Sequence, residues 1–249
     1  MARTRLDKLV LERGLALTRE KAQALILAGQ IRVNGQPATK AGALVAGDSR
    51  VELVGEPPRY VSRGGLKLEG ALRDFGVDVC GKVCLDIGAS TGGFTDCLLQ
   101  HGAARVYAVD VGKGQLDWKL RQDARVQVRE GINARYLKPE NLGEAVDLVT
   151  IDVAFISVEK ILPAALRCAP PSSVFLILVK PQFELSRREV GKGGIVRDAA
   201  LQQKAVEKIR RAAAAVGLED LAVRESCLPG AEGNREFFLR ARVVAATKL

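Results

Sequence analysis

Histidine and cysteine are scarce in this chain of 249 residues, which contains one histidine and five cysteines. A structural zinc site needs four nitrogen or sulfur ligands at suitable spacing. Cys80 and Cys84 have neither a second cysteine pair nor a histidine near them in the sequence. We therefore predict no metal site, and buried, reduced thiols in place of disulfides.

Long apolar runs are also absent. No stretch approaches the roughly 20 apolar residues that cross a bilayer, and the charged residues 1–8 have no apolar stretch behind them, as a secretory signal would. These absences predict a cytoplasmic protein without membrane contact. Hydrophobic residues nevertheless make up 47% of the chain, which is enough for a sizeable core and excludes a disordered protein.

Positive charge is abundant and unevenly spread. The net charge is +9, and residues 1–40 alone hold eight lysines or arginines against three acids. This balance favours an anionic partner, which is a nucleic acid, an acidic protein or a membrane surface, and charge alone does not choose among them. A solvated helical face would account for the same residues.

Residues 1–58 are predicted to form a small α+β domain. Apolar residues recur at helical spacing near the N-terminus, and Asn34-Gly35 between alternating residues indicates a tight hairpin turn. Consecutive prolines stop both helices and strands, so Pro57-Pro58 marks a linker. The predicted elements are helices over 6–13 and 18–27, a hairpin over 31–37 and a strand over 50–54.

Residues 59–249 are predicted to form a Rossmann-like α/β domain. Near-continuous apolar runs alternate with helical segments, which favours a parallel sheet covered on both faces. The runs cover 83–87, 105–110, 147–152 and 173–180, and 237–243 is predicted as a late antiparallel strand. Ligands bind such sheets at the carboxyl ends of the strands.

The loop over 86–95 is rich in glycine and admits three interpretations. A dinucleotide site would need a second glycine where Ser90 stands, because a pyrophosphate requires close backbone approach. A hydrolase elbow around Ser90 would need a histidine, and His101 lies roughly 16 Å away if both are on one helix. S-adenosylmethionine carries no phosphate, so the loop need only cradle its amino-acid and ribose portions.

An S-adenosylmethionine site is the interpretation that fits best, and the loop resembles that of nucleoside methyltransferases. Asp110 ends the next strand, where a carboxylate suits the two hydroxyls of a ribose. Asn133, in the segment 130–133, is a candidate adenine contact. The candidate cofactor residues are Asp86, Gly88, Ser90, Gly92, Gly93, Phe94, Asp110 and Asn133.

Two lysines and two acids stand at strand ends or in adjoining loops: Lys67, Asp152, Lys180 and Glu236. Each alone is consistent with a charge facing water, although Lys180 follows six apolar residues and precedes a proline. Methyl transfer to a ribose hydroxyl must hold oxygen and methyl in line and must remove a proton from a very weak acid. A lysine whose pKa is lowered by burial or by a second cation is a suitable base.

These segments resemble the FtsJ-like ribose 2′-O-methyltransferases, whose catalytic tetrad runs Lys, Asp, Lys, Glu in chain order. The segments 5–7, 18–22 and 32–35 resemble a small RNA-binding domain named after a ribosomal small-subunit protein. From about Arg5 to Phe238 the chain is similar to the TlyA, or haemolysin A-like, family. One departure is Ala154, where the family pattern has serine.

The resemblance implies methylation of a ribose 2′-hydroxyl, that of cytidine, with S-adenosylmethionine as cofactor and ribosomal RNA or a ribosomal subunit as partner. It implies that Lys180 takes the hydroxyl proton and that Asp152 orients Lys180, while Lys67 and Glu236 position the ribose. The implied RNA-binding residues are Arg5, Arg19, Lys21, Arg32 and Arg63, and the loop 191–197 is a candidate cover over the substrate.

Three alternatives stay open from the sequence. The first is a non-catalytic RNA-binding or ribosome-assembly factor, which would share the charge pattern. The second is a membrane-active haemolysin, which would need an amphipathic or spanning segment. The third is a base methyltransferase, whose usual Pro-Cys or Asn-Pro-Pro-Tyr motifs do not occur in the sequence.

Overall fold

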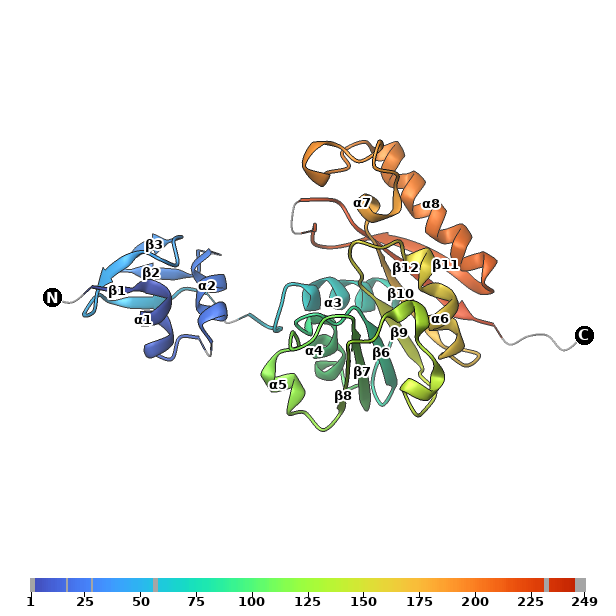
Figure 1. Ribbon diagram of the computed structural model, residues 1–249, viewed down its shortest axis with the longest axis horizontal. Coiled ribbons are helices and arrows are strands. Elements are labelled where there is room, and N and C mark those ends of the chain that lie inside the picture. The colour runs from blue at the N-terminus through green and yellow to red at the C-terminus, as the bar shows by residue number, and fades with distance from the viewer. Residues whose placement is uncertain (1–2, 17, 28, 56–57, 231–232, 245–249) are drawn as a thin grey trace, which may run out of the picture. The chain divides into compact units, whose positions relative to one another are not determined.

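In the computed structural model the chain divides into two compact units, Met1–Pro57 and Pro58–Leu249 (Figure 1). The structure describes residues 3–16, 18–27, 29–55, 58–230 and 233–244. Glu56 and Pro57 of the predicted linker lie outside these ranges. Each unit has a hydrophobic core of its own.

The N-terminal unit packs two helices against short strands. Leu6 and Val10 of the first helix and Ala22 and Ile26 of the second are fully buried in one core. The strand β2 pairs antiparallel with both β3 and β5, and β1 pairs antiparallel with β4. The elements are β1 (Arg3–Arg5), α1 (Leu6–Glu12), α2 (Arg19–Leu27), β2 (Ile31–Val33), β3 (Gln36–Ala38), β4 (Leu44–Ala46) and β5 (Val51–Leu53).

The predicted hairpin of this unit is confirmed. Asn34 and Gly35 have φ angles of 50° and 81°, so the turn between β2 and β3 uses the left-handed backbone that these residues tolerate. Thr18 begins α2, because its hydroxyl oxygen accepts a hydrogen bond from the backbone N–H of Lys21 at 3.2 Å. The strands β1 and β4 were not predicted, since three residues carry too little alternation to be recognised.

The C-terminal unit is built on a seven-stranded sheet with the order β11-β12-β10-β9-β6-β7-β8. The strands from β10 to β8 in this order are parallel, whereas β12 runs antiparallel to β10 and β11. The predicted parallel sheet and late antiparallel strand are confirmed, and β8 and β11 are additional. The strands are β6 (Val83–Ile87), β7 (Arg105–Asp110), β8 (Val126–Glu130), β9 (Leu148–Ile151), β10 (Val174–Val179), β11 (Leu218–Glu225) and β12 (Phe237–Val243).

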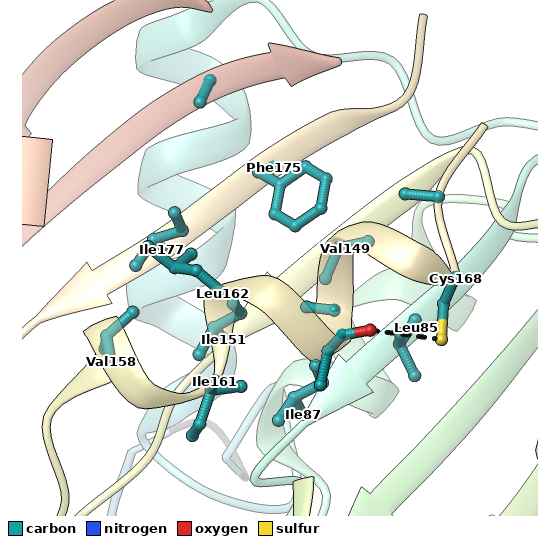
Figure 2. Close-up of a cluster of buried hydrophobic side chains, with 14 of the residues drawn as sticks. Leu85, Ile87, Val149, Ile151, Val158, Ile161, Leu162, Cys168, Phe175 and Ile177 are labelled. Atoms are coloured by element: carbon teal, nitrogen blue, oxygen red, sulfur yellow. Dashed lines mark hydrogen bonds between the residues drawn. The ribbon is translucent and has the colours of Figure 1, made fainter. Parts of the chain in front are cut away.

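Helices cover both faces of this sheet (Figure 1). Because side chains alternate along a strand, Leu85 and Ile87 join the core under α6 and α8, whereas Cys84 joins the core under α3 and α4. Figure 2 shows the first of these cores, with Leu162 of α6 against the strands. The helices are α3 (Gly64–Phe75), α4 (Gly93–Gln100), α5 (Trp118–Arg121), α6 (Leu162–Arg167), α7 (Pro181–Glu184) and α8 (Ala199–Ala215), with 3-10 turns at Ala134–Tyr136, Pro139–Asn141, Val158–Lys160 and Lys192–Gly194.

The cysteines of the protein are all free. The prediction that they are buried is right for Cys84, Cys97 and Cys168 but wrong for Cys80 and Cys227, which are exposed because they lie in loops beside β6 and β11. In the part of the chain that the structure describes, no group of three or more His, Cys, Asp or Glu side chains is placed to hold a metal ion.

Candidate active site

A cavity of about 430 Å³ opens at the carboxyl ends of β6, β7 and β9. This is the edge at which an open parallel sheet binds its ligands. Residues that line it include four of the predicted cofactor residues, namely Gly88, Ser90, Asp110 and Asn133. Gln115, Asp152 and Phe155 line it as well.

Gly88 brings the ends of β6 and β9 together. A side chain at this position would place its first carbon 2.1 Å from the backbone oxygen of Asp152, far inside contact distance. The φ angle of Gly88 is 86°, in the left-handed region that other residues avoid. Glycine is therefore required here, and it exposes bare backbone to the cavity.

Asp110, at the end of β7, joins two loops around the cavity. One carboxylate oxygen accepts a hydrogen bond from the backbone N–H of Ser90 at 2.8 Å, and the other accepts from the N–H of Gly112 at 2.7 Å. Each oxygen has a second lone pair, so the carboxylate can also receive ribose hydroxyls. Asn133 is fixed nearby, because its side-chain oxygen accepts from the backbone N–H of Arg135 at 3.1 Å.

Asp86 is a predicted cofactor residue that the structure places in the interior instead of the cavity lining. Its carboxylate is fully buried and accepts hydrogen bonds from the hydroxyls of Thr95 and Thr150 at 2.7 and 3.0 Å. Burial disfavours the charged form and raises the pKa of Asp86 to about 7. Asp86 therefore holds β6, α4 and β9 together behind the cavity.

Gly92, Gly93 and Phe94, also predicted to bind the cofactor, do not line the cavity either. A side chain at Gly92 would meet Leu120 at 2.3 Å, and one at Gly93 would meet the hydroxyl of Ser62 at 2.2 Å. The ring of Phe94 stacks on another buried ring with centroids 6.1 Å apart. Gly92, Gly93 and Phe94 therefore allow neighbouring elements to pack closely against the loop. The residue types in the sequence do not distinguish this packing role from contact with a ligand.

The four predicted catalytic residues form two ion pairs. Nζ of Lys180 lies 2.5 Å from Oδ1 of Asp152, and Nζ of Lys67 lies 2.5 Å from Oε2 of Glu236. The Lys67–Glu236 pair is a buried hydrogen bond, with side chains 9% and 3% exposed. The Lys180–Asp152 contact is not aligned as a hydrogen bond, which leaves Oδ1 of Asp152 buried without a hydrogen-bonding partner among the described residues.

The sheet explains why residues so distant in sequence meet. The strands β10 and β12 pair so that Lys180, the residue after β10, lies beside Glu236, the residue before β12. Asp152 directly follows β9, which is the other neighbour of β10. Lys67 reaches Glu236 from α3. The two ion pairs therefore lie at the edge of the sheet that carries the cavity. Asp152 is a member of one ion pair and also lines the cavity.

Phe155 belongs to the site and was not predicted. Its side chain is 93% exposed, its φ angle is 64°, and it lines the cavity. Its ring packs against the ring of Phe183 with centroids 5.3 Å apart. Its place three residues after Asp152 was visible in the sequence, but its exposure was not, because phenylalanine is more often a core residue.

Two of the predicted RNA-binding residues of the N-terminal unit, Arg5 and Arg19, contact a buried acid. Nε of Arg5 and Nε of Arg19 each lie 3.0 Å from a carboxylate oxygen of Asp7, which is fully buried. The two arginine side chains are still 47% and 52% exposed. Arg32 is exposed on β2, and Lys21 is half-buried on α2. The structure thus brings Arg5 and Arg19 together on Asp7.

Arg63 and the loop 191–197 belong to the C-terminal unit. Arg63 is exposed and donates a hydrogen bond to the backbone oxygen of Pro229 at 3.0 Å. The side-chain oxygen of Asn234, just before β12, accepts a hydrogen bond from the backbone N–H of Val196 at 2.9 Å. The loop predicted to cover the substrate is therefore tied at one end to the segment that leads into β12.

Known families define the class of this protein. A family model of FtsJ-like methyltransferases matches residues 60–243, and a model of the S4 domain matches residues 4–51. The first match agrees with the parallel sheet and its strand-end cavity, and the second covers the two helices and short strands of the N-terminal unit. The chain is therefore an FtsJ-like methyltransferase that carries an S4 domain.

Proteins of similar sequence and structure identify a particular family within the FtsJ-like methyltransferases. The 16S/23S rRNA (cytidine-2′-O)-methyltransferase TlyA of Mycobacterium tuberculosis is 47% identical over 241 residues, which is 96% of this chain and 90% of that protein. Hemolysin A of Brachyspira hyodysenteriae is 43% identical over 94% of this chain and 97% of its own length. A solved structure described as "Putative hemolysin from Streptococcus thermophilus" aligns with a TM-score of 0.78 and 42% identity over 99% of this chain and 90% of that one. The chain belongs to the TlyA family, as the sequence motifs predict.

Proposed function

We propose that this protein transfers a methyl group from S-adenosylmethionine to the ribose 2′-hydroxyl of cytidine in ribosomal RNA. The observation that carries the proposal is the pair of lysine–carboxylate ion pairs beside the strand-end cavity. A hydroxyl is a very weak acid, so its methylation needs a base and a counter-charge of this kind. The relative in Mycobacterium tuberculosis, named as a cytidine-2′-O-methyltransferase, supports the choice of substrate.

The residues around the cavity suit a nucleoside methyl donor. Gly88 offers bare backbone, Asp110 offers a carboxylate for ribose hydroxyls, and Asn133 offers a carboxamide for the base. The volume of about 430 Å³ falls in the usual range for small-ligand sites. When bound, S-adenosylmethionine supplies a methyl group activated by a positively charged sulfur.

In the proposed mechanism Lys180 removes the proton of the 2′-hydroxyl. As Lys180 takes up the proton, the carboxylate of Asp152 at 2.5 Å balances the new positive charge. The buried pair of Lys67 and Glu236 positions the ribose at the same edge of the sheet.

Residues other than the two ion pairs are proposed to bind the target base and the surrounding RNA. Phe155, exposed beside the cavity and braced by Phe183, supplies a ring on which a nucleobase stacks. Arg5, Arg19 and Arg32 of the S4 domain contact phosphates, which gives affinity without reading sequence. Because the substrate is ribosomal RNA, we place the reaction in the cytoplasm.

A hemolysin name among the relatives raises a rival function. No helix in the described part of the chain is both long and apolar enough to cross a bilayer. A non-catalytic assembly factor is the second rival, and it would bind the same RNA without any need for two lysine–carboxylate pairs. Neither rival transfers a methyl group, so one assay separates both from the proposed enzyme.

The test is transfer of labelled methyl from S-adenosylmethionine to unmodified small and large ribosomal subunits, followed by digestion to nucleosides. We expect 2′-O-methylcytidine as product. We expect Lys180→Ala to lower the rate by roughly 100-fold or more, the usual contribution of a general base. Lys160→Ala, which removes an exposed lysine from the Val158–Lys160 turn, is the matched control and should keep full activity.

Each other outcome points to a different conclusion. Label on a base would keep the fold and cofactor but overturn the ribose assignment. Full activity of folded Lys180→Ala would remove Lys180 from its role as base. Bound S-adenosylmethionine with no label on either subunit would favour an assembly factor, and leakage of liposomes by the pure protein would favour a membrane-active one.

A further inference from the structure

Glu130 lies beneath the loop 112–116, which follows β7 at the edge of the cavity. It is the last residue of β8 and pairs in register with Asp110. One carboxylate oxygen accepts a hydrogen bond from the backbone N–H of Gly114 at 2.8 Å, and the other accepts from those of Gln115 and Leu116 at 3.2 and 3.4 Å. A single side chain thus holds three consecutive amides of the loop.

Arg121 completes this arrangement from α5. Its guanidinium forms an ion pair with Glu130, and its Nε donates a hydrogen bond to the backbone oxygen of Leu116 at 3.1 Å. Burial alone would raise the pKa of Glu130, but the amides of the loop and Arg121 outweigh burial and hold the pKa below its usual range. The Glu130 side chain is 14% exposed, and its bonds to Leu116 and Arg121 are partly buried, whereas those to Gly114 and Gln115 lie at the surface.

The loop that Glu130 holds carries groups that face the cavity. Gln115 lines the cavity, and its side chain folds over Gly112, where an added carbon would meet its Nε2 at 2.3 Å. Gly112 in turn donates its N–H to Asp110 at 2.7 Å. The orientation of both Gln115 and Asp110 therefore depends on the conformation of the loop.

We propose that Glu130 is a positioning residue for the methyl donor, which fixes the loop 112–116 so that Asp110 and Gln115 face the donor's ribose. This proposal rests on the proposed function, in which S-adenosylmethionine occupies the cavity. Glu130 itself does not line the cavity, so it acts through the loop. It should therefore affect binding of the donor and leave the chemical step and the binding of RNA unchanged.

The test is the full-length Glu130→Gln variant, which keeps one acceptor oxygen but loses the charge. With ribosomal subunits saturating, we expect the KM for S-adenosylmethionine to rise roughly 10-fold, as for other residues that orient a ligand-binding group from behind, with kcat within about twofold. Calorimetric titration of the RNA-free protein should show the same rise in Kd. Arg121→Gln, a milder second variant, should raise both constants less.

The matched control is Glu144→Gln. Glu144 is also a carboxylate paired with an arginine, Arg105, and it accepts a hydrogen bond from the hydroxyl of Tyr107 on β7, but it does not line the cavity. Unchanged KM and Kd in both test variants would overturn the proposal, as would a lower kcat at constant KM or an equal loss in Glu144→Gln. A wild-type protein that neither binds the donor nor methylates subunits would refute the proposed function instead.

Discussion

Two buried aspartates show how neighbours decide the chemistry of one residue type. Asp7 and Asp86 are both fully buried, and each follows a leucine in the sequence. Hydrogen bonds from Arg5 hold the pKa of Asp7 well below its usual range, helped by Arg19. The pKa of Asp86 rises because burial outweighs its two threonine partners. The sequence shows two similar dipeptides, and only the tertiary contacts distinguish them.

The raised pKa of Asp86 predicts a stability that falls as pH rises. Between its unfolded pKa of about 4 and its folded pKa of about 7, the folded protein binds more protons than the unfolded chain. The contribution of this carboxyl to the free energy of unfolding therefore decreases over that range, by at most about 4 kcal/mol. Asp86→Asn removes the titration, so in urea denaturation its stability relative to wild type should improve from pH 5 to pH 8. Parallel pH profiles of the two proteins would contradict this.

Secondary-structure elements were predictable where burial imposes a strong pattern. The strands β6, β7, β9 and β10 are covered on both faces, and their apolar runs stand out. The edge strands β8 and β11 mix charged and apolar residues, so their pattern is weak. The order of the sheet needs pairing between distant segments, and that pairing is what sets Lys180 beside Glu236. The types and chain order of the four candidate catalytic residues, and the pairing of Asp152 with Lys180, were therefore predictable, whereas the ion pair between Lys67 and Glu236 was not.

The helices of the S4 domain depend on Asp7, which predicts a local loss of stability in Asp7→Asn. Asp7 lies in α1 and accepts hydrogen bonds from Arg19 and Gln23 of α2. Removing its charge should cost roughly 2 kcal/mol, less than for a fully buried pair because both arginines are half-exposed. The lowered pKa means that this stabilisation is present above about pH 4 and is lost in stronger acid.

Hydrogen exchange of the α1 amides measures this loss at pH 7. Glu12→Gln is the control, because Glu12 is an exposed carboxylate of the same helix whose ion pair with Lys8 is long, at 3.6 Å. The α1 amides of the Glu12→Gln variant should exchange as they do in the wild-type protein. Equal protection of α1 in Asp7→Asn and wild type would show that the buried charge does not hold the two helices together.

The two units of the protein carry different features: positive charge is concentrated in the first, and the candidate active site lies in the second. Residues 1–40 carry eight basic and three acidic side chains, a net +5 of the total +9. The cavity and both lysine–carboxylate pairs belong to the other unit. Contacts with phosphates are independent of sequence, so the proposed function assigns general affinity for RNA to the S4 domain and the choice of nucleotide to the methyltransferase domain.

This division predicts how Arg32→Ala should behave. Loss of one phosphate contact should lower the slope of log affinity against log salt by about 0.7 to 0.9, while the KM for S-adenosylmethionine stays constant. Binding of ribosomal RNA at several salt concentrations measures the slope. Arg50→Ala should change it less, because Arg50 is already neutralised by Glu52 at 2.7 Å. An unchanged slope in Arg32→Ala would remove Arg32 from the RNA-binding surface.

Gly88, which lines the cavity proposed for the methyl donor, lies against the backbone of Asp152, the acid paired with the proposed base Lys180. A side chain at position 88 would displace both the cavity wall and the backbone of Asp152. A single substitution there would therefore change donor binding and proton transfer at the same time. A lineage that replaced Gly88 would have to reshape the end of β9 at the same time, and positions 88 and 152 should either change together across descendants or not change at all.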